Sequence, residues 1–287
     1  MNFPKDIPAQ AQEEQPGLEY KMHDPEPITI RDTFKGADKL KDKVALITGG
    51  DSGIGRAVAV HFAREGADVS IVCTPSEEKD AEETRQMVEK EGRDCLIQMG
   101  DLRSPDFCAE IVEKTVKKFK KLDILVNNAG LHYEVENLTD ISDEQLSETF
   151  EVNVFSFFHV TQAALKHLKK GACIINTASV VAYRGSQSLM DYAATKGAVV
   201  AFTRSLSGNL ASKGIRVNGV APGPIWTPII VSGREPDKVK GFGGDTPMGR
   251  PGQPCELGPA YVFLASEDAS YITGQMIHVN GGSIINT

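Results

Sequence analysis

Short apolar runs alternate with longer segments of helical periodicity from Lys43 almost to the end of the chain. Residues 44–48 form the first run, which has the length and continuous apolar character of a buried parallel strand. Further strands are predicted at residues 69–74, 94–99, 122–126, 172–176, 215–220 and 276–279. This alternation favours an α/β fold, with one doubly wound parallel sheet of about seven strands flanked by helices.

The segments between the strands are predicted to be helices at residues 53–65, 76–91, 105–119, 142–168, 188–211 and 256–265. The helix at 76–91 is strongly charged and therefore expected to be exposed, and Pro105 is tolerated because it falls in a first helical turn. Residues 229–252 form an irregular segment that carries several glycines. Long irregular loops in compact domains are usually functional, so we expect this segment to form a lid over the substrate.

Residues 1–38 differ from the rest of the chain, because five of the fifteen prolines lie there and no periodicity is visible. The chain therefore divides into an extended arm at 1–38 and one folded domain at 39–287. The arm carries spaced apolar residues, namely Leu18, Tyr20, Met22, Ile28, Ile30 and Phe34. Spaced apolar residues suit docking on a preformed surface, so we expect residues 16–38 to lie on the domain and the first dozen to be mobile.

Composition excludes several classes of protein. The net charge of −8 argues against a general nucleic-acid surface, and no apolar run is long enough to span a membrane. The N-terminus lacks the basic-then-apolar order of a signal peptide, so a cytoplasmic protein is expected. The five cysteines are scattered without a C-x-x-C pair, and the histidines show no metal-ligand spacing. Neither a disulfide framework nor a metal site is predicted.

A glycine-rich turn joins the first strand to the first helix. Gly49, Gly53 and Gly55 let backbone N–H groups approach a ligand, and the helix directs the positive end of its dipole into the turn. We interpret the turn as a pyrophosphate cradle, which makes residues 39–287 a dinucleotide-binding domain. The segment around Ser52 also looks like a protease nucleophile site, but the elbow motif needs glycine where Ile54 stands. Ser52 is instead expected to cap the helix or to contact a phosphate.

Tyr192 and Lys196 lie four residues apart on a predicted helix of small apolar residues, and hence on one face. A nearby ammonium stabilises a phenolate, which would bring the tyrosine pKa closer to the range useful for proton transfer. Ser179 follows the strand at 172–176, where its hydroxyl could hold a substrate oxygen. Asn153 lies inside a predicted helix, and sequence alone favours a packing role for its amide.

The residues from Lys43 to Gly282 resemble the short-chain dehydrogenase/reductase family. The resemblance rests on Thr48 to Gly55, on the Asn-Asn-Ala-Gly run at 127–130, on Ser179, Tyr192 and Lys196, and on Pro222-Gly223. It implies a Rossmann-type fold and a catalytic tetrad of Asn153, Ser179, Tyr192 and Lys196. In that scheme Lys196 also binds the nicotinamide ribose, and Asn153 holds a water molecule in a proton relay.

The resemblance also implies a set of residues that bind NAD or NADP. These residues are Gly49, Asp51, Ser52, Gly53, Ile54, Gly55, Thr74, Asp101, Leu102, Asn128, Ala129, Gly130, Tyr192, Lys196, Pro222, Gly223, Ile225 and Thr227. Cys73 stands where NAD-binding folds usually carry a carboxylate, and no arginine replaces it. Glu77 and Glu78 lie close in sequence, so the choice stays open with a slight preference for NADP.

The arm and the Gly-Gly-Asp-Ser-Gly-Ile-Gly-Arg run together resemble a narrower subgroup, which contains bacterial stress-associated oxidoreductases and glucose/ribitol dehydrogenase homologues. This resemblance implies an NAD(P)-dependent oxidoreductase acting on an alcohol or carbonyl compound such as a sugar, polyol, aldehyde or ketone. It also implies a homotetramer. Two alternatives stay open: a dinucleotide-binding regulatory protein without turnover, and a dehydratase or epimerase on the same scaffold.

Overall fold

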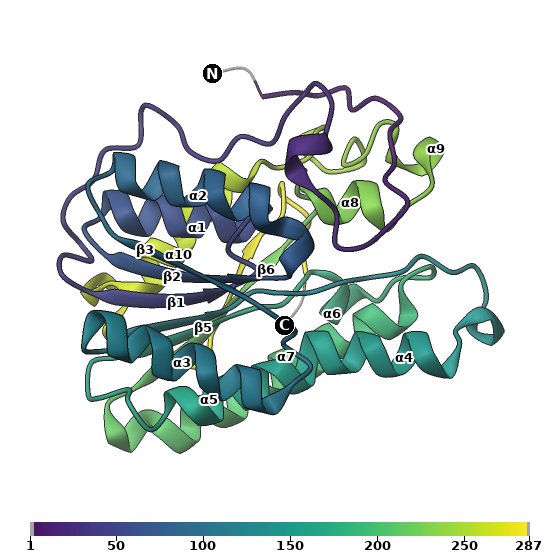
Figure 1. Cartoon of the computed structure of the whole chain (residues 1–287). Helices are drawn as coiled ribbons and strands as arrows, with labels where there is room; N and C mark the ends of the chain where they lie inside the picture. Colours follow the sequence, from purple (N-terminus) through teal and green to yellow (C-terminus); the bar gives the residue numbers. More distant parts are fainter. Residues whose placement is uncertain (1–2, 286–287) are drawn as a thin grey trace.

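A parallel sheet forms the centre of the molecule in the computed structural model, which describes residues 3–285 (Figure 1). Within these residues the sheet has seven strands in the order β3-β2-β1-β4-β5-β6-β7, and every neighbouring pair is parallel. The strands are β1 (Val44–Thr48), β2 (Asp68–Cys73), β3 (Cys95–Met99), β4 (Ile124–Asn127), β5 (Cys173–Thr177), β6 (Arg216–Pro222) and β7 (Met276–Val279). The predicted doubly wound Rossmann-type sheet is confirmed, and its strand order reverses between β1 and β4.

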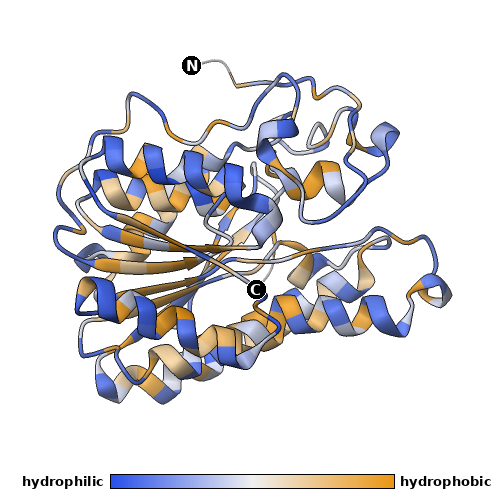
Figure 2. Cartoon of the chain, in the orientation of Figure 1, coloured by the Kyte–Doolittle hydropathy of each residue, from blue (hydrophilic) through white to orange (hydrophobic). Residues whose placement is uncertain are grey.

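Helices cover both faces of the sheet. One layer contains α1 (Gly53–Arg64), α2 (Glu78–Lys90) and α10 (Pro254–Ala265), and the other contains α3 (Pro105–Phe119), α5 (Ser156–Ala164) and α7 (Met190–Leu210) (Figure 1). Within β1, Ala45 and Ile47 pack into the first layer's core, whereas Leu46 packs into the other. Both faces of the strand are therefore buried, which explains its unbroken apolar run (Figure 2).

The predicted uninterrupted helix at 142–168 is wrong in its interior. It consists of α4 (Asp143–Phe150), a π-helical segment η4 (Glu151–Phe155) and α5, which ends at Ala164. A π segment adds one residue to a turn, and this small shift does not disturb hydrophobic periodicity enough to be seen in a sequence. Asn153 lies in the π segment, where its side-chain amide bonds to the main chain of Leu131.

Three short helices were not predicted: α6 (Val181–Arg184), which precedes α7, and α8 (Pro228–Ser232) and α9 (Pro236–Val239), which lie in the segment predicted to be irregular. Both α8 and α9 begin with proline, whose fixed φ suits a first helical turn. The remaining turns are single 3-10 turns at Glu19–Lys21, Pro75–Glu77, Leu138–Asp140, Ala211–Lys213 and Glu267–Ala269. The segment after β6 is thus partly ordered as helix rather than wholly irregular.

The arm packs on the domain along a greater length than predicted. Ile7 and Met22 are buried with Trp226 in a small core that also includes residues of α8 and α9. Gln12 N donates to Val231 O at 2.7 Å, and Gly241 N donates to Ile7 O at 3.0 Å. Docking therefore begins well before residue 16, and the expectation of a free segment of about a dozen residues is wrong.

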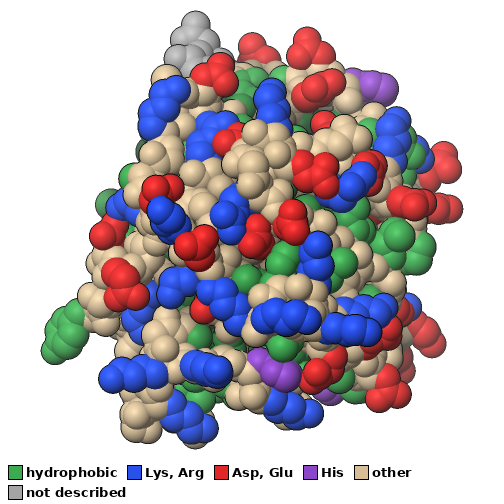
Figure 3. Space-filling model, turned by 60° about the vertical axis from the view of Figure 1, so that its left-hand side comes forward, with side chains coloured by type: hydrophobic (Ala, Val, Ile, Leu, Met, Phe, Trp, Pro, Cys, Tyr) green, Lys and Arg blue, Asp and Glu red, His purple; other side chains and the backbone are tan. Residues whose placement is uncertain are grey.

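In Figure 3, acidic and basic side chains are intermixed over the upper part of the face, and Lys and Arg side chains predominate over its lower part. Within residues 3–285, no helix combines the length and the apolar character that crossing a bilayer requires.

Trp226, the single tryptophan, reports on arm docking because its Nε1 donates to Pro25 O at 2.7 Å within the same small core. Ile7→Ala is expected to lower Tm by roughly 5 °C and to shift tryptophan emission to longer wavelength, since it opens this core. Ile284→Ala is the control, because Ile284 is 96% exposed. An Ile7→Ala protein with the Tm and emission of the control would contradict the docking.

Candidate active site

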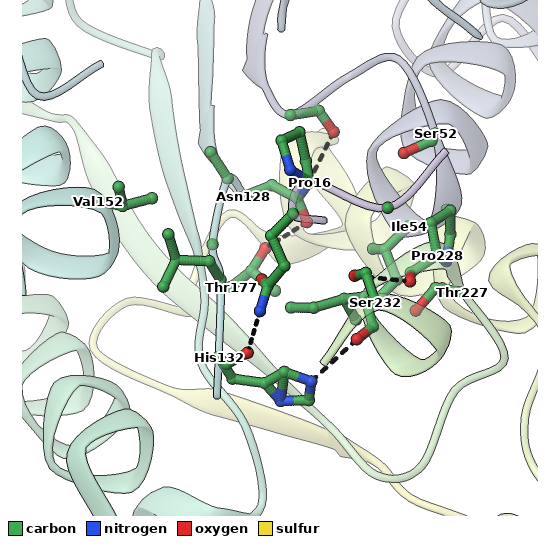
Figure 4. Close-up of a pocket in the computed structure, with 18 of the residues that line it drawn as sticks. Pro16, Ser52, Ile54, Asn128, His132, Val152, Thr177, Thr227, Pro228 and Ser232 are labelled. Carbon is green, nitrogen blue, oxygen red and sulfur yellow. Dashed lines mark hydrogen bonds between the residues drawn. The ribbon is translucent and has the colours of Figure 1, made fainter. Parts of the chain in front are cut away.

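A cavity of about 680 Å³ opens at the carboxyl ends of the central strands. It lies at the reversal of strand order between β1 and β4, where open α/β sheets bind ligands, and its volume suits a cofactor with a small substrate. Residues from the glycine turn, from the ends of β4, β5 and β6, from α7 and from the arm line it (Figure 4). Every predicted site residue lines this cavity except Gly55 and Asn153.

The glycine turn forms a floor made of backbone. The backbone φ angles of Gly49 and Gly53 are +61° and +50°, values that residues other than glycine rarely adopt. A Cβ on Gly55 would lie 1.7 Å from Gly49 O, so this residue serves the close approach of α1 to the turn rather than lining the cavity. The helix α1 begins at Gly53 and directs its N-terminus toward the cavity. This floor fits the pyrophosphate of a dinucleotide.

Ser52 occupies the N-cap position of α1 but makes no side-chain capping bond among the described residues, so that part of the prediction is wrong. A carboxylate from the arm takes this role: Glu19 Oε2 accepts from Gly53 N at 2.6 Å, and Glu19 Oε1 accepts from Arg56 Nη1 at 2.8 Å. Burial raises the pKa of Glu19 to about 7, although Arg56 and the Gly53 N–H oppose the shift. The arm thus completes the N-terminus of the cofactor helix, and contact of Ser52 with a phosphate stays a prediction.

Carboxyl groups gather at the end of the cavity that Thr74, Asp101 and Leu102 line. The family resemblance implies that Asp101 and Leu102 contact the adenine, which makes this the adenosine end. Glu77 Oε2 accepts from Thr74 N at 2.8 Å, while Asp51 Oδ2 is buried without a partner among the described residues. Burial raises the pKa of Glu77 to about 8, and repulsion from Asp51 adds to the shift. Burial also raises the pKa of Asp51 to about 6, although a hydrogen bond from the Ser52 side chain opposes the shift. An unpartnered carboxyl oxygen at this position fits a ribose hydroxyl.

Arg103 is a cavity residue that sequence analysis missed. Its guanidinium pairs with Asp101 at 2.7 Å and with Glu148 at 3.2 Å. It follows β3 rather than β2, so a search limited to the end of β2 could not find it. A cation therefore does lie at the adenosine end, although two carboxylates partly neutralise it.

The end of the cavity opposite the carboxyl cluster brings Ser179, Tyr192 and Lys196 together. Lys196 Nζ donates to Thr177 O at 3.0 Å and lies 5.5 Å from the centre of the Tyr192 ring. Because α7 carries both side chains four residues apart and β5 ends just before Ser179, the geometry follows from local structure. This arrangement can hold a substrate oxygen beside a phenol and an amine.

The electrostatics of this pair differ from the sequence-based expectation. Burial raises the pKa of Tyr192 to about 12, while the Ser179 hydroxyl and Arg234 act in the opposite direction. Burial lowers the pKa of Lys196 to about 7. The expected lowering of the Tyr192 pKa by Lys196 is therefore not found, because the amine is itself desolvated and only partly charged near neutral pH.

Asn153 is fully buried and does not line the cavity. Its Oδ1 accepts from Leu131 N at 2.9 Å, and its Nδ2 donates to Leu131 O at 2.9 Å and to Thr195 Oγ1 at 3.2 Å. These bonds join the π segment to the loop after β4 and to α7. The geometry gives Asn153 the packing role that sequence alone favoured, and its part in a proton relay stays a prediction.

Sequence analysis also missed His132 and the arm residues Gln15, Pro16 and Gly17, which line the cavity (Figure 4). Gln15 Nε2 donates to His132 O across the cavity, and a Cβ on Gly17 would lie 2.4 Å from Pro228 O. The His132 ring is 5.4 Å from the Tyr192 ring, and burial lowers the histidine pKa to about 3, so it stays neutral. No local pattern marks these residues, since their partners lie far away in sequence.

Comparison with known proteins agrees with this geometry. A family model described as enoyl-(acyl carrier protein) reductase matches residues 49–283. The chain is 55% identical over 286 residues to general stress protein 39 of Bacillus subtilis, covering 100% of this chain and 99% of the relative. It is 50% identical over 285 residues to glucose and ribitol dehydrogenase of Daucus carota, covering 98% of each.

Among solved structures, a short-chain dehydrogenase from Burkholderia cenocepacia in complex with NADP superposes with a TM-score of 0.80. The two chains are 31% identical, and the match covers 85% of this chain and 98% of that one. This chain belongs to the short-chain dehydrogenase/reductase family, and within it to the subgroup that its sequence resembled. It is an NAD(P)-dependent oxidoreductase.

Lys196→Met is expected to stabilise the protein without cofactor at pH 6 and to stabilise it less at pH 10. The unfolded lysine titrates near 10.4, whereas burial lowers the folded pKa to about 7. Between pH 7 and pH 10, folding therefore releases the lysine proton. The burial of Lys196 destabilises the protein most below pH 7, and this destabilisation decreases as the pH rises toward 10. Tm of both proteins across this range measures the effect, with Lys213→Met as the exposed-lysine control. A Tm difference independent of pH would contradict it.

Proposed function

We propose that Tyr192 is the proton donor and acceptor of a hydride transfer between the nicotinamide and an alcohol or carbonyl substrate. The observation that supports this role is the meeting of Tyr192, Ser179 and Lys196 in one cavity with the glycine cradle. A nicotinamide cofactor gives or takes the hydride when bound. The chain's own groups must then transfer one proton and orient the substrate oxygen.

The phenol of Tyr192 is protonated at neutral pH, because its pKa is raised to about 12. It can therefore donate a proton to a carbonyl oxygen as negative charge develops there. The hydroxyl of Ser179 orients the same oxygen, and neutral His132 packs beside the phenol without competing as a cation. In this proposal Lys196 binds the ribose and supplies charge when an anion lies nearby; the hydrogen bond from its Nζ to Thr177 O supports the role by fixing the amine in the cavity.

Tyr192→Phe is expected to lower kcat/KM by a factor of roughly 10³ while leaving the Kd for the cofactor within a few-fold. The aromatic ring and its packing remain, and only the transferable proton is lost. Absorbance of the reduced cofactor during turnover measures activity, and its fluorescence measures binding. Tyr271→Phe is the control, since Tyr271 is fully exposed. Near-normal turnover by Tyr192→Phe would rule out the proposed proton donor.

For the cofactor we propose a preference for NADP. The related structure from Burkholderia cenocepacia holds NADP, and Cys73 at the end of β2 places no carboxylate against a 2′-phosphate. The hydroxyls of Thr74 and Ser76 and the guanidinium of Arg103 line the same end. Glu77 and Asp51 act against the preference when ionised. The pKa of Glu77, about 8, keeps this carboxyl mostly protonated near neutral pH, whereas Asp51, with a pKa of about 6, is mostly ionised there.

Cys73→Asp is expected to move the preference toward NAD by tenfold or more, because a new carboxylate repels the 2′-phosphate and accepts from ribose hydroxyls. Cys73→Ser is the control of similar size without charge. Dissociation constants for both cofactors, measured on all three proteins, decide the matter. A strong native preference for NAD would defeat the proposal.

We also propose sugars and polyols as the substrate class, a cytoplasmic location and a homotetramer. The substrate class rests on the similarity to the carrot glucose and ribitol dehydrogenase.

The homotetramer is supported by two exposed aromatic side chains. Phe155 and Phe158 are 50% and 41% exposed at the junction of η4 and α5, which makes this face suited to pairing. Sedimentation velocity giving a stable monomer at micromolar concentration would exclude the tetramer, and cell fractionation tests the location.

A further inference from the structure

A second cavity, of about 340 Å³, adjoins the catalytic cavity. The two cavities share six lining residues: Val180, Arg184, Gly223, Pro224, Arg234 and Phe242. Residues 238–246 and the C-terminal segment at 280–285 contribute the rest of the second cavity's wall. A substrate whose reacting carbon lies at Tyr192 can therefore direct its far end into this second cavity.

Basic side chains outnumber acidic ones in the wall of the second cavity. Arg184, Arg234, Lys238 and Lys240 line it, and Asp245 is the one acidic residue of its wall among residues 3–285. Glu134 supplies a second carboxylate, which pairs with Arg234 at 3.0 Å and with Lys238 at 3.5 Å. Within the described residues, Arg184 and Lys240 form no ion pair, so the four cations exceed the two carboxylates. This excess occurs in a chain of net charge −8.

Arg234 connects the two cavities. Its guanidinium is held by Glu134 and by the face of the Phe242 ring, whose centre is 5.3 Å away. Its Nε is buried and has no partner among the described residues. A buried N–H of a guanidinium costs free energy unless an acceptor reaches it, and phosphate and carboxylate oxygens are the acceptors that arginine matches best.

We propose that the second cavity binds an anionic group, a phosphate monoester or a carboxylate, carried by the substrate at the end away from the reacting carbon. The substrate class is then a phosphorylated or carboxylated sugar, polyol or hydroxyaldehyde rather than its neutral counterpart. This inference rests on the proposed function of the catalytic cavity. Arg234 positions the anion, and Arg184 and Lys240 supply the charge that the carboxylates leave uncompensated.

The test compares charged and neutral members of substrate pairs: glyceraldehyde 3-phosphate with glyceraldehyde, glucose 6-phosphate with glucose, and glucuronate with glucose. The charged members are expected to have a kcat/KM at least tenfold higher at saturating cofactor. In the double variant Arg184→Gln/Lys240→Gln, KM for the charged members should rise roughly tenfold, while KM for the neutral members stays within about twofold. Lys213→Gln is the control, because Lys213 is exposed and lies before β6 at the other end of the sheet.

Binding of glycerol 3-phosphate to the protein without cofactor, measured by calorimetry, gives a readout independent of turnover. The double variant should weaken this binding by about tenfold, whereas binding in the glycine cradle would be the same in both proteins. Equal kcat/KM for charged and neutral compounds, or unchanged binding in the double variant, overturns the inference. Turnover of neutral compounds that depends on Tyr192 would then leave the proposed function intact. Preference for glucuronate over glucose 6-phosphate would assign the cavity to carboxylates.

Discussion

The close approach of α1 to the glycine turn is the contact on which the rest of the structure depends. A side chain at Gly55 would overlap Gly49 O at 1.7 Å, so only glycine allows the helix to begin where it does. A side chain at Gly49 would meet the backbone of Ala129, which follows β4. The turn thus controls how closely β1, β4 and α1 pack, and the cavity above them follows from that spacing. A substitution here would disturb the fold and the cofactor site together.

The arm completes the cofactor site that the glycine turn forms. The N-terminus of α1 leaves backbone N–H groups without helical partners, and Ser52 does not satisfy them through its side chain. Glu19 reaches Gly53 N from the arm and pairs with Arg56 on the next turn of α1. Gln15 spans the cavity to His132, and Trp226 anchors the arm beyond it. The segment that sequence composition assigned to a peripheral arm is therefore a wall of the cofactor site.

The site residues that could be predicted from the sequence are those whose partners lie a few residues away in the chain. The glycines, Tyr192 and Lys196 act through neighbours a few residues away, so their pattern is visible in the sequence. Glu19, His132 and Arg234 act through contacts between distant segments, and nothing in their surroundings distinguishes them from ordinary surface residues. The π segment was not predicted for a different reason: it shifts the helix by one residue without altering its apolar face. The packing role of the Asn153 amide agrees with the sequence, but its partner Leu131, which lies in the loop after β4, could not be predicted.

Desolvation sets the electrostatics of the whole cavity, and it acts in the same direction at both ends. It keeps Tyr192 protonated, strips charge from Lys196 and raises the pKa values of Glu19, Asp51 and Glu77. Desolvation thus brings the pKa values of Glu19, Glu77 and Lys196 to about 7 to 8, so a nearby charge can change the protonation of these groups near neutral pH. An anion bound beside Lys196 would favour the charged amine, and a charged amine would oppose the raised pKa of Tyr192. The lowering of the phenol's pKa that the sequence suggested therefore depends on a charge that burial partly removes from the Lys196 amine near neutral pH.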